Sequence, residues 1–316
     1  MSTMDNTTCR SLSAFTLSGI PYLEDFNVWF GFPLILMYIV AVLGNTTIIY
    51  IIIKNHSLHK PMYIFLSMLT TVDLLLATST MPQMLGIFWF DRREISFSMC
   101  LAQMFFIAFL SAVESGVLLA MAVDRYVAIC HPLKYSSVFT PRTITKIFVA
   151  IIVRGAAGLI PFPLIIKRLP LWKNHLLSHS YCLHQEVMKS ACGNINLNII
   201  YGLFIILFIM GLDSVFIFIS YLLIIKTMAG LVKGSSLKGI STCTAHICAV
   251  LIYYIPLLGL SVVHRFNKSG IPNIHILFGN VYLLFPPVIN PLIYGIKTKE
   301  IWNKLSKLLR KICQIS

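Results

Sequence analysis

The chain has 316 residues, of which 57% are hydrophobic and 11% charged, and its mean hydropathy is +0.83. A soluble domain cannot cover so much apolar surface, so the composition excludes a soluble protein and predicts a polytopic membrane protein. The net charge of +14 does not indicate a nucleic-acid partner, because the basic residues flank apolar runs and no basic helix or aromatic RNA-binding motif accompanies them.

Residues 1–27 form a polar tail before the first apolar run. The tail lacks the basic start, apolar core and small-residue cleavage site of a cleaved signal peptide, so we expect the first apolar run to target the chain. Most lysines and arginines fall on segments that are cytoplasmic if the amino end is outside. The sequence therefore predicts an extracellular tail, and Asn6-Thr7-Thr8 is a glycosylation sequon on it.

Seven apolar runs follow, and each is long enough to cross a bilayer as a helix. They cover about residues 28–53, 61–88, 100–126, 143–166, 197–226, 240–263 and 272–296. We expect an all-α membrane protein with a seven-transmembrane helix bundle over residues 28–296. In residues 297–316 the apolar and basic residues fall on opposite faces of a helix, which predicts a cytoplasmic amphipathic eighth helix on the lipid surface.

Four charged residues lie deep inside the predicted spans, away from the span ends. At about 1.5 Å of rise per residue, Asp73 and Glu114 fall at similar depth on neighbouring helices. Two close acids in a membrane need a cation or a proton, so a shared sodium ion is one hypothesis and a protonated, hydrogen-bonded pair without metal is the other. For Arg154 and Asp213 we expect structural pairing inside the bundle.

Four motifs stand at the ends of these runs. They are Leu58-His-Lys-Pro-Met-Tyr63, Met121-Ala-Val-Asp-Arg-Tyr-Val-Ala-Ile-Cys-His-Pro-Leu-Lys-Tyr135, Lys238-Gly-Ile-Ser-Thr-Cys-Thr-Ala-His246 and Pro286-Pro-Val-Ile-Asn-Pro-Leu-Ile-Tyr294. In this order, over roughly residues 25–312, they resemble the rhodopsin-like G-protein-coupled receptors in the form of the vertebrate odorant receptors. The strings Ser180-Tyr-Cys-Leu-His-Gln185 and His264-Arg265-Phe266 are similar to those of class I, or fish-like, odorant receptors.

The resemblance implies a plasma-membrane receptor that binds a small odorant outside and activates a stimulatory olfactory G protein inside, raising cyclic AMP. No enzymatic chemistry is implied, and the only cofactor hypothesis is an allosteric sodium ion. The resemblance assigns the inner switch to Asp124, Arg125, Tyr126, Asn290, Pro291 and Tyr294. We expect Arg125 to pair with Asp124 at rest and to contact the G protein once the sixth helix moves.

The resemblance also implies a disulfide between Cys100 and Cys182, which ties the third helix to the long outer loop. Odorant receptors usually have a second cysteine pair in that loop, at the positions of Trp172 and Cys192. This chain departs from the pattern at Trp172. We therefore expect Cys192 to be an odd outer thiol, free or mispaired.

The expected ligand site lies at the outer end of the sixth helix. Arg265 is roughly 14 Å beyond Pro256, near a roof formed by His184 and Gln185, and Ser261 is one turn below it. An arginine facing a dry pocket favours a carboxylate, whereas an arginine that extends to the headgroups has no such role. The resemblance favours the first interpretation, because acid-responsive class I receptors bear an arginine there.

Ala108 stands where related receptors often have a histidine, and the added volume favours a longer ligand tail. The sequence therefore predicts a medium-chain carboxylic acid anchored by Arg265. The residues expected to line the site are Phe105, Ala108, Phe109 and Ser261, with His184 and Gln185 above.

Three other functions compete with the receptor interpretation. The buried charges suit a transporter or ion channel, but no pair of interrupted spans recurs in matching halves of the chain. An intramembrane hydrolase would need a His-Glu-x-x-His or Gly-x-Asp motif, which the sequence lacks. A receptor homologue that no longer signals stays open.

Overall fold

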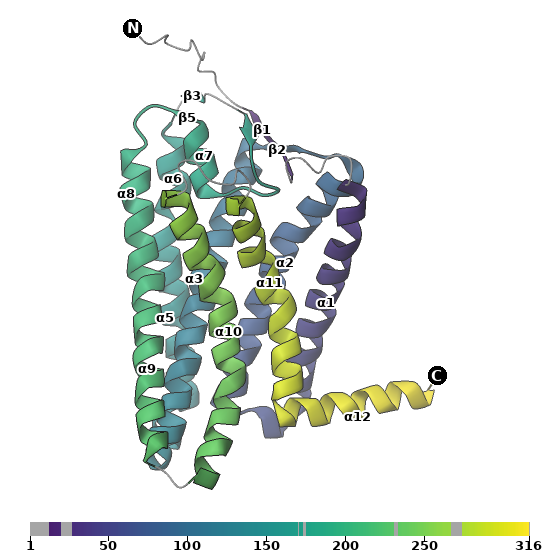
Figure 1. Ribbon diagram of the computed structural model, residues 1–316, viewed down its shortest axis with the longest axis vertical. Helices are drawn as coiled ribbons and strands as arrows, with labels where there is room; N and C mark the ends of the chain where they lie inside the picture. Colours follow the sequence, from purple (N-terminus) through teal and green to yellow (C-terminus); the bar gives the residue numbers. More distant parts are fainter. Residues whose placement is uncertain are drawn as a thin grey trace.

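The computed structural model describes residues 13–19, 27–169, 171–172, 175–230, 233–266 and 274–315. These residues form a bundle of long helices that stand side by side, with residues 13–19 at one end of the bundle and residues 299–315 at the other (Figure 1). The long helices are α1 (Asn27–Lys54), α2 (Pro61–Phe90), α3 (Phe97–Cys130), α5 (Pro141–Leu159) with α6 (Pro161–Lys167), α8 (Asn196–Ile205) with η4 (Ile206–Gly211) and α9 (Leu212–Ala229), α10 (Lys233–Phe266) and α11 (Ile274–Lys297).

These helices correspond to the seven predicted spans. Five described helical segments are long and apolar enough to cross a membrane, and α10 adds a shorter apolar stretch. The five are Gly31–Lys54, Pro61–Phe90, Phe97–Cys130, Pro141–Lys167 and Asn196–Ala229, and the shorter one is Cys243–Gly259. The all-α seven-transmembrane bundle is thus confirmed.

Local sequence explains where several helices begin and break. Ser96 caps α3 by accepting a hydrogen bond from the backbone N–H of Met99 (3.4 Å), and Thr140 caps α5 in the same way. The fourth span breaks between Leu159 and Pro161, since proline cannot donate the backbone hydrogen bond that would continue the helix. The fifth span contains a π-helical segment, η4, that no sequence signal marked.

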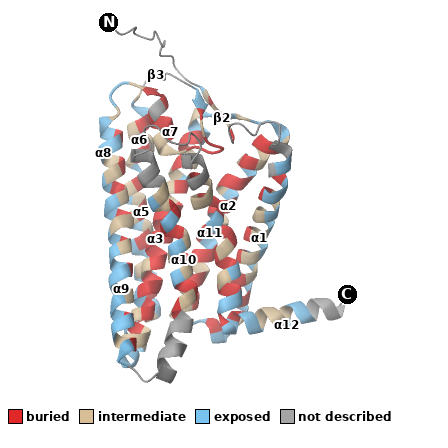
Figure 2. Cartoon of the chain, viewed as in Figure 1, coloured by how far each residue is buried: buried red, intermediate tan, exposed pale blue. Residues whose placement is uncertain are grey.

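Burial separates the interior of the bundle from its lipid-facing surface (Figure 2). The buried side of α3 is mostly apolar, whereas large side chains such as Phe218 and Leu258 are exposed on the outside, as expected for helices in lipid. Asn45 is fully buried, and its Nδ2 donates to the carbonyl oxygens of Ala41 and Pro287, both at 2.8 Å. This amide therefore joins α1 to α11.

A small sheet covers the outer end of the bundle. Strand β1 (Ala14–Leu17), from the amino-terminal tail, pairs antiparallel with β2 (Glu94–Ser96) and parallel with β4 (Leu176–Leu177). Phe15 and Leu17 of β1 are fully buried, so the end of the tail is packed into the fold. The rest of the long outer loop forms α7 (His184–Ser190) and the pair β3 (Leu171–Trp172) and β5 (Ala191–Cys192).

Disulfides hold this outer layer in place. The expected bond between Cys100 and Cys182 is present, with the two Cα atoms 5.5 Å apart. The expectation for Cys192 was wrong, because Cys192 is also disulfide-bonded. The partner of Cys192 lies outside the described residues. The expectation failed because it considered only the loop position that Trp172 occupies.

At the inner end, three short helices and one long one follow the spans. The short ones are η2 (His56–Leu58), η3 (Pro132–Lys134) and α4 (Tyr135–Val138). The long one, α12 (Lys299–Ile315), lies across the end of the bundle rather than along it (Figure 1). It matches the predicted amphipathic eighth helix.

Candidate functional site

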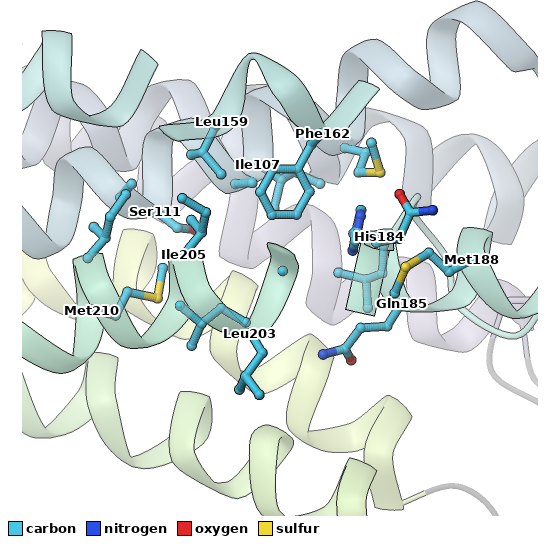
Figure 3. A pocket seen from close by; sticks show the side chains of 18 of the residues that line it. Ile107, Ser111, Leu159, Phe162, His184, Gln185, Met188, Leu203, Ile205 and Met210 are labelled. Atoms are coloured by element: carbon cyan, nitrogen blue, oxygen red, sulfur yellow. The ribbon is translucent and has the colours of Figure 1, made fainter. Parts of the chain in front are cut away.

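The outer half of the bundle encloses a cavity of about 430 Å³ between α3, α5, α6, α8, η4, α10 and α11, with α7 above it (Figure 3). This volume lies within the range of about 300–1,000 Å³ typical of small-molecule sites. The lining is mostly aliphatic and aromatic. It comprises Met104, Ile107, Ala108, Ser111, Ala112, Leu159, Phe162, Cys182, Leu183, His184, Gln185, Met188, Asn198, Ile199, Gly202, Leu203, Ile205, Ile206, Ile209, Met210, Leu257 and Tyr282.

Small residues on two helices create the space. On α3 the lining positions follow helical spacing, and Ala108 and Ala112 leave room where larger side chains would fill it. On α8, Gly202 lies against the roof: a Cβ atom there would be 3.5 Å from the imidazole of His184. Glycine at this position therefore lets α8 approach the roof closely.

Polar side chains stand at both ends of the cavity, with His184 and Gln185 at the outer end and Ser111 at the inner end. In Figure 3, His184, Gln185 and Met188 lie at one end, and Ser111 and Met210 lie at the other. Burial lowers the pKa of His184 to about 4, so its imidazole is neutral at physiological pH. The described wall carries no charged side chain. The cavity thus suits an amphipathic molecule with its polar head outside and its hydrocarbon part further in.

The roof is held in place by Gln103 on α3. Its Nε2 donates to the carbonyl oxygen of Ser79 on α2 (3.0 Å), and its Oε1 accepts from the backbone N–H of Cys182 (3.0 Å). The ring of Phe162 on α6 packs edge-on against His184, with 4.4 Å between ring centroids. The outer loop is therefore fixed to three helices beside the cavity.

A buried charge network begins one helical turn further in. Arg154 donates to Asp213 through Nη1 (2.6 Å) and Nη2 (2.7 Å), so the pairing expected between them is confirmed. Ser115 Oγ donates to Asp213 Oδ2 (2.7 Å) and lies 2.9 Å from the hydroxyl of Tyr254. The network joins α3, α5, α9 and α10 directly beneath the cavity.

Asp73 and Glu114 lie deeper, on α2 and α3, and both are buried. Asn290 Nδ2 donates to Asp73 Oδ2 (3.0 Å). Asp73 Oδ1 and Glu114 Oε1 have no hydrogen-bond partner among the described residues. Two buried carboxylate oxygens without donors are a chemically suitable donor set for a small hard cation. The described part of the chain holds no cluster of three or more His, Cys, Asp or Glu side chains that could bind a metal.

The inner end contains the expected charge pair. Arg125 Nη2 lies 3.5 Å from Asp124 Oδ2, and both side chains are buried. Tyr135 donates to Asp124 Oδ1 (2.6 Å), so the acid is held by α4 as well as by its neighbour. The hydroxyl of Tyr126 lies 3.1 Å from Nε2 of His131, and Tyr294 of α11 is fully buried.

His246 of α10 is a residue that the sequence marked only as part of a motif. Its Nε2 lies 3.0 Å from the carbonyl oxygen of Leu118 on α3, and its Nδ1 is hydrogen-bonded to the hydroxyl of Tyr221 on α9. This imidazole therefore holds α10 against two other helices, between the charge network and the inner switch.

A family model described as "Olfactory receptor" matches residues 34–312. The chain belongs to the olfactory receptor family. The receptor is 54% identical to human "Olfactory receptor 51E1" over 298 residues, which cover 94% of each chain. It is 53% identical to mouse "Olfactory receptor 51E2" over 302 residues, which cover 95% of this chain and 94% of the mouse protein.

Among solved structures, squid rhodopsin matches with a TM-score of 0.74 at 16% identity, and the match covers 93% of this chain and 88% of that one. The olfactory receptor therefore has the fold of a rhodopsin-like receptor. It is a multi-pass plasma-membrane protein with a small-molecule ligand and a G-protein partner, and it is not an enzyme. The transporter, channel and hydrolase alternatives are set aside on this basis.

The receptor places only some of the expected ligand residues in its cavity. Ala108, His184 and Gln185 line it. Phe105 and Phe109 do not, and this expectation was wrong. Each is one position beyond a lining residue and is therefore turned about 100° around α3. The two rings stack on each other, and Phe109 lies beside Gly155 of α5.

For three expected positions the structure of the receptor describes no side chain. Arg265 and Ser261 belong to α10, but their side chains are not described, and Asn6 precedes the described part of the tail. Reasoning from sequence also missed Asn198, which lines the cavity from α8. The sequence signal that could have identified Asn198 as a cavity residue is its place as a single polar residue on the buried side of an apolar helix.

Proposed function

We propose that this olfactory receptor binds a medium-chain carboxylic acid in its outer cavity and activates a stimulatory olfactory G protein, which raises cyclic AMP. The observation that carries the proposal is the contrast between the outer end of the cavity, with His184 and Gln185, and a mostly apolar inner end that includes Ser111. A carboxyl head beside His184 and Gln185 leaves the hydrocarbon chain among aliphatic side chains. Burial of the chain supplies most of the affinity, at about 0.8 kcal/mol per methylene.

Arg265 is the proposed anchor for the carboxylate. The described wall offers no cation and His184 is neutral, so we assign the positive charge to Arg265, which belongs to the outer end of α10. A guanidinium binds a carboxylate through two parallel hydrogen bonds. Loss of such a charged contact costs about 1.5–3 kcal/mol, which corresponds to a tenfold or greater loss of potency.

Cyclic AMP assays in cells that express the receptor test the proposal. The panel comprises alkanoic acids, alkanols, aldehydes and methyl esters of matched chain length. The acids should be the most potent, and Arg265→Ala should raise their half-maximal concentration at least tenfold. Arg265→Lys is the matched control, because it keeps the charge but loses the geometry of two parallel hydrogen bonds. Its half-maximal concentration should lie between those of the wild type and Arg265→Ala. Equal potency of acid and methyl ester, or an unchanged Arg265→Ala response, contradicts the proposal.

We also propose that a sodium ion lies between Asp73 and Glu114. The two unpartnered carboxylate oxygens support it. Agonist potency should then depend on sodium concentration in the wild type and lose that dependence in Glu114→Gln. Potency that is independent of sodium in both proteins supports the protonated pair instead.

A further inference from the structure

Asn198 is a buried polar side chain that faces the cavity without a protein partner. It is 2% exposed, and it lies in the first turn of α8 among apolar neighbours. Its Oδ1 accepts no hydrogen bond from any described residue. Buried side-chain polar atoms are nearly always hydrogen-bonded in folded proteins, so an unpartnered one on a cavity wall marks a group available to a ligand.

The position of Asn198 places this group at the polar end of the cavity. Asn198 and Gly202 are four residues apart and so lie on the same face of α8. A Cβ atom at Gly202 would be 3.5 Å from His184 and 3.9 Å from Phe162, which places this face of α8 against the roof. The group that meets Asn198 therefore belongs to the head of the ligand or to the carbons next to it.

The chemistry of an amide selects among the possible ligand groups. A carboxylate, an ester or an aldehyde only accepts hydrogen bonds, so none of them can satisfy Oδ1 of Asn198. If the amide is turned so that Nδ2 takes the place of Oδ1, an acceptor is needed instead. A hydroxyl group donates and accepts, and it satisfies Asn198 in both orientations.

We propose that Asn198 is a specificity residue that binds a hydroxyl group close to the head of the ligand, so that the preferred ligands are medium-chain hydroxy acids. This inference rests on the proposed function, because it assumes that a carboxylic acid occupies the cavity. Arg265 is the anchor of the carboxylate, and Asn198 is the separate anchor of the hydroxyl. The two contacts can therefore be tested independently.

The test is a set of cyclic AMP concentration–response curves for octanoic acid, 2-hydroxyoctanoic acid and 3-hydroxyoctanoic acid, with surface expression measured for each variant. In the wild type, at least one hydroxy acid should be about tenfold more potent than octanoic acid, as expected for one additional hydrogen bond in a dry site. Asn198→Leu keeps the branching and the number of side-chain heavy atoms but removes the polar atoms, so it should abolish this preference while it still responds to octanoic acid. The matched control is Asn196→Leu, two residues away on the exposed side of α8, which should keep the preference.

If Asn198→Leu does not reach the surface, Asn198→Thr provides the second variant, because it keeps a hydroxyl and should retain part of the preference. Equal potency of the hydroxy acids and octanoic acid in the wild type overturns the proposal for Asn198 alone. A preference for hydroxy acids that persists in Asn198→Leu also overturns the proposal for Asn198 alone. No response to any of the three acids overturns the proposed function, and this inference with it.

Discussion

Removal of Arg154 should strongly destabilise the receptor. Asp213 is 1% exposed and receives three hydrogen bonds, two from Arg154 and one from Ser115. In Arg154→Leu the carboxylate keeps only the bond from Ser115 and stays buried without a counter-charge. Breaking a buried ion pair by removing one partner costs about 3–5 kcal/mol.

The exposure of Arg154 narrows the expected loss of stability in Arg154→Leu. The Arg154 side chain is 31% exposed, so partial solvation lowers the expected cost to about 3 kcal/mol. One kcal/mol shifts the melting temperature of a domain of 150–250 residues by about 2–4 °C, and somewhat less in a larger chain. Arg154→Leu should therefore lower the melting temperature by roughly 5–10 °C. The double variant Arg154→Leu/Asp213→Leu should recover most of this loss, because neither charge is then left unpaired.

Thermal unfolding of the purified receptor in detergent measures both effects. A thiol-reactive fluorophore reports unfolding through Cys243, which is free and 3% exposed in the folded state. A fall of less than about 2 °C in Arg154→Leu would refute the reasoning. So would a double variant that is as unstable as the single one.

Three further predictions concern other parts of the molecule. We expect the inner switch to release Arg125 from Asp124, so Arg125→Ala should abolish agonist-driven cyclic AMP at near-normal surface expression; preserved signalling would remove Arg125 from the mechanism. Cys192→Ser should reduce surface expression, since loss of a native disulfide costs about 2–5 kcal/mol, and wild-type expression would count against this bond. Between pH 7.5 and 5.5, agonist potency should follow the same profile in wild type and His184→Gln, because a pKa of about 4 keeps the imidazole neutral throughout; profiles that diverge near pH 6.5 would contradict the neutral roof.

The transmembrane helices could be predicted because each is a long apolar run bounded by charges or prolines. The outer sheet could not, since its strands are two to four residues long and pair the tail with two distant loops. The irregularities within the fourth and fifth spans differ in the same way. Pro161 marked the break in the fourth span, whereas no residue marked the π-helical segment of the fifth.

The cavity was predicted in place but not in detail. The helix that contains Ala108 is apolar almost all round, so its sequence does not show which face points inward, and Phe105 and Phe109 were assigned to the wrong side. The second outer disulfide escaped for a similar reason. Because Trp172 replaces the usual cysteine, the loop sequence offers Cys192 no partner. The disulfide of Cys192 depends on a residue that the loop sequence alone does not identify.

The most direct test of the central claim is the chain length of the acid that activates the receptor best. Cyclic AMP responses to a series of unbranched alkanoic acids should peak at medium length in the wild type. Ala108→His fills part of the cavity and should move the peak to shorter acids, with a roughly fourfold loss of potency for each methylene that no longer fits. Ala108→Val should shift the peak in the same direction by volume alone. An identical optimum in all three proteins would show that the acid does not occupy this cavity.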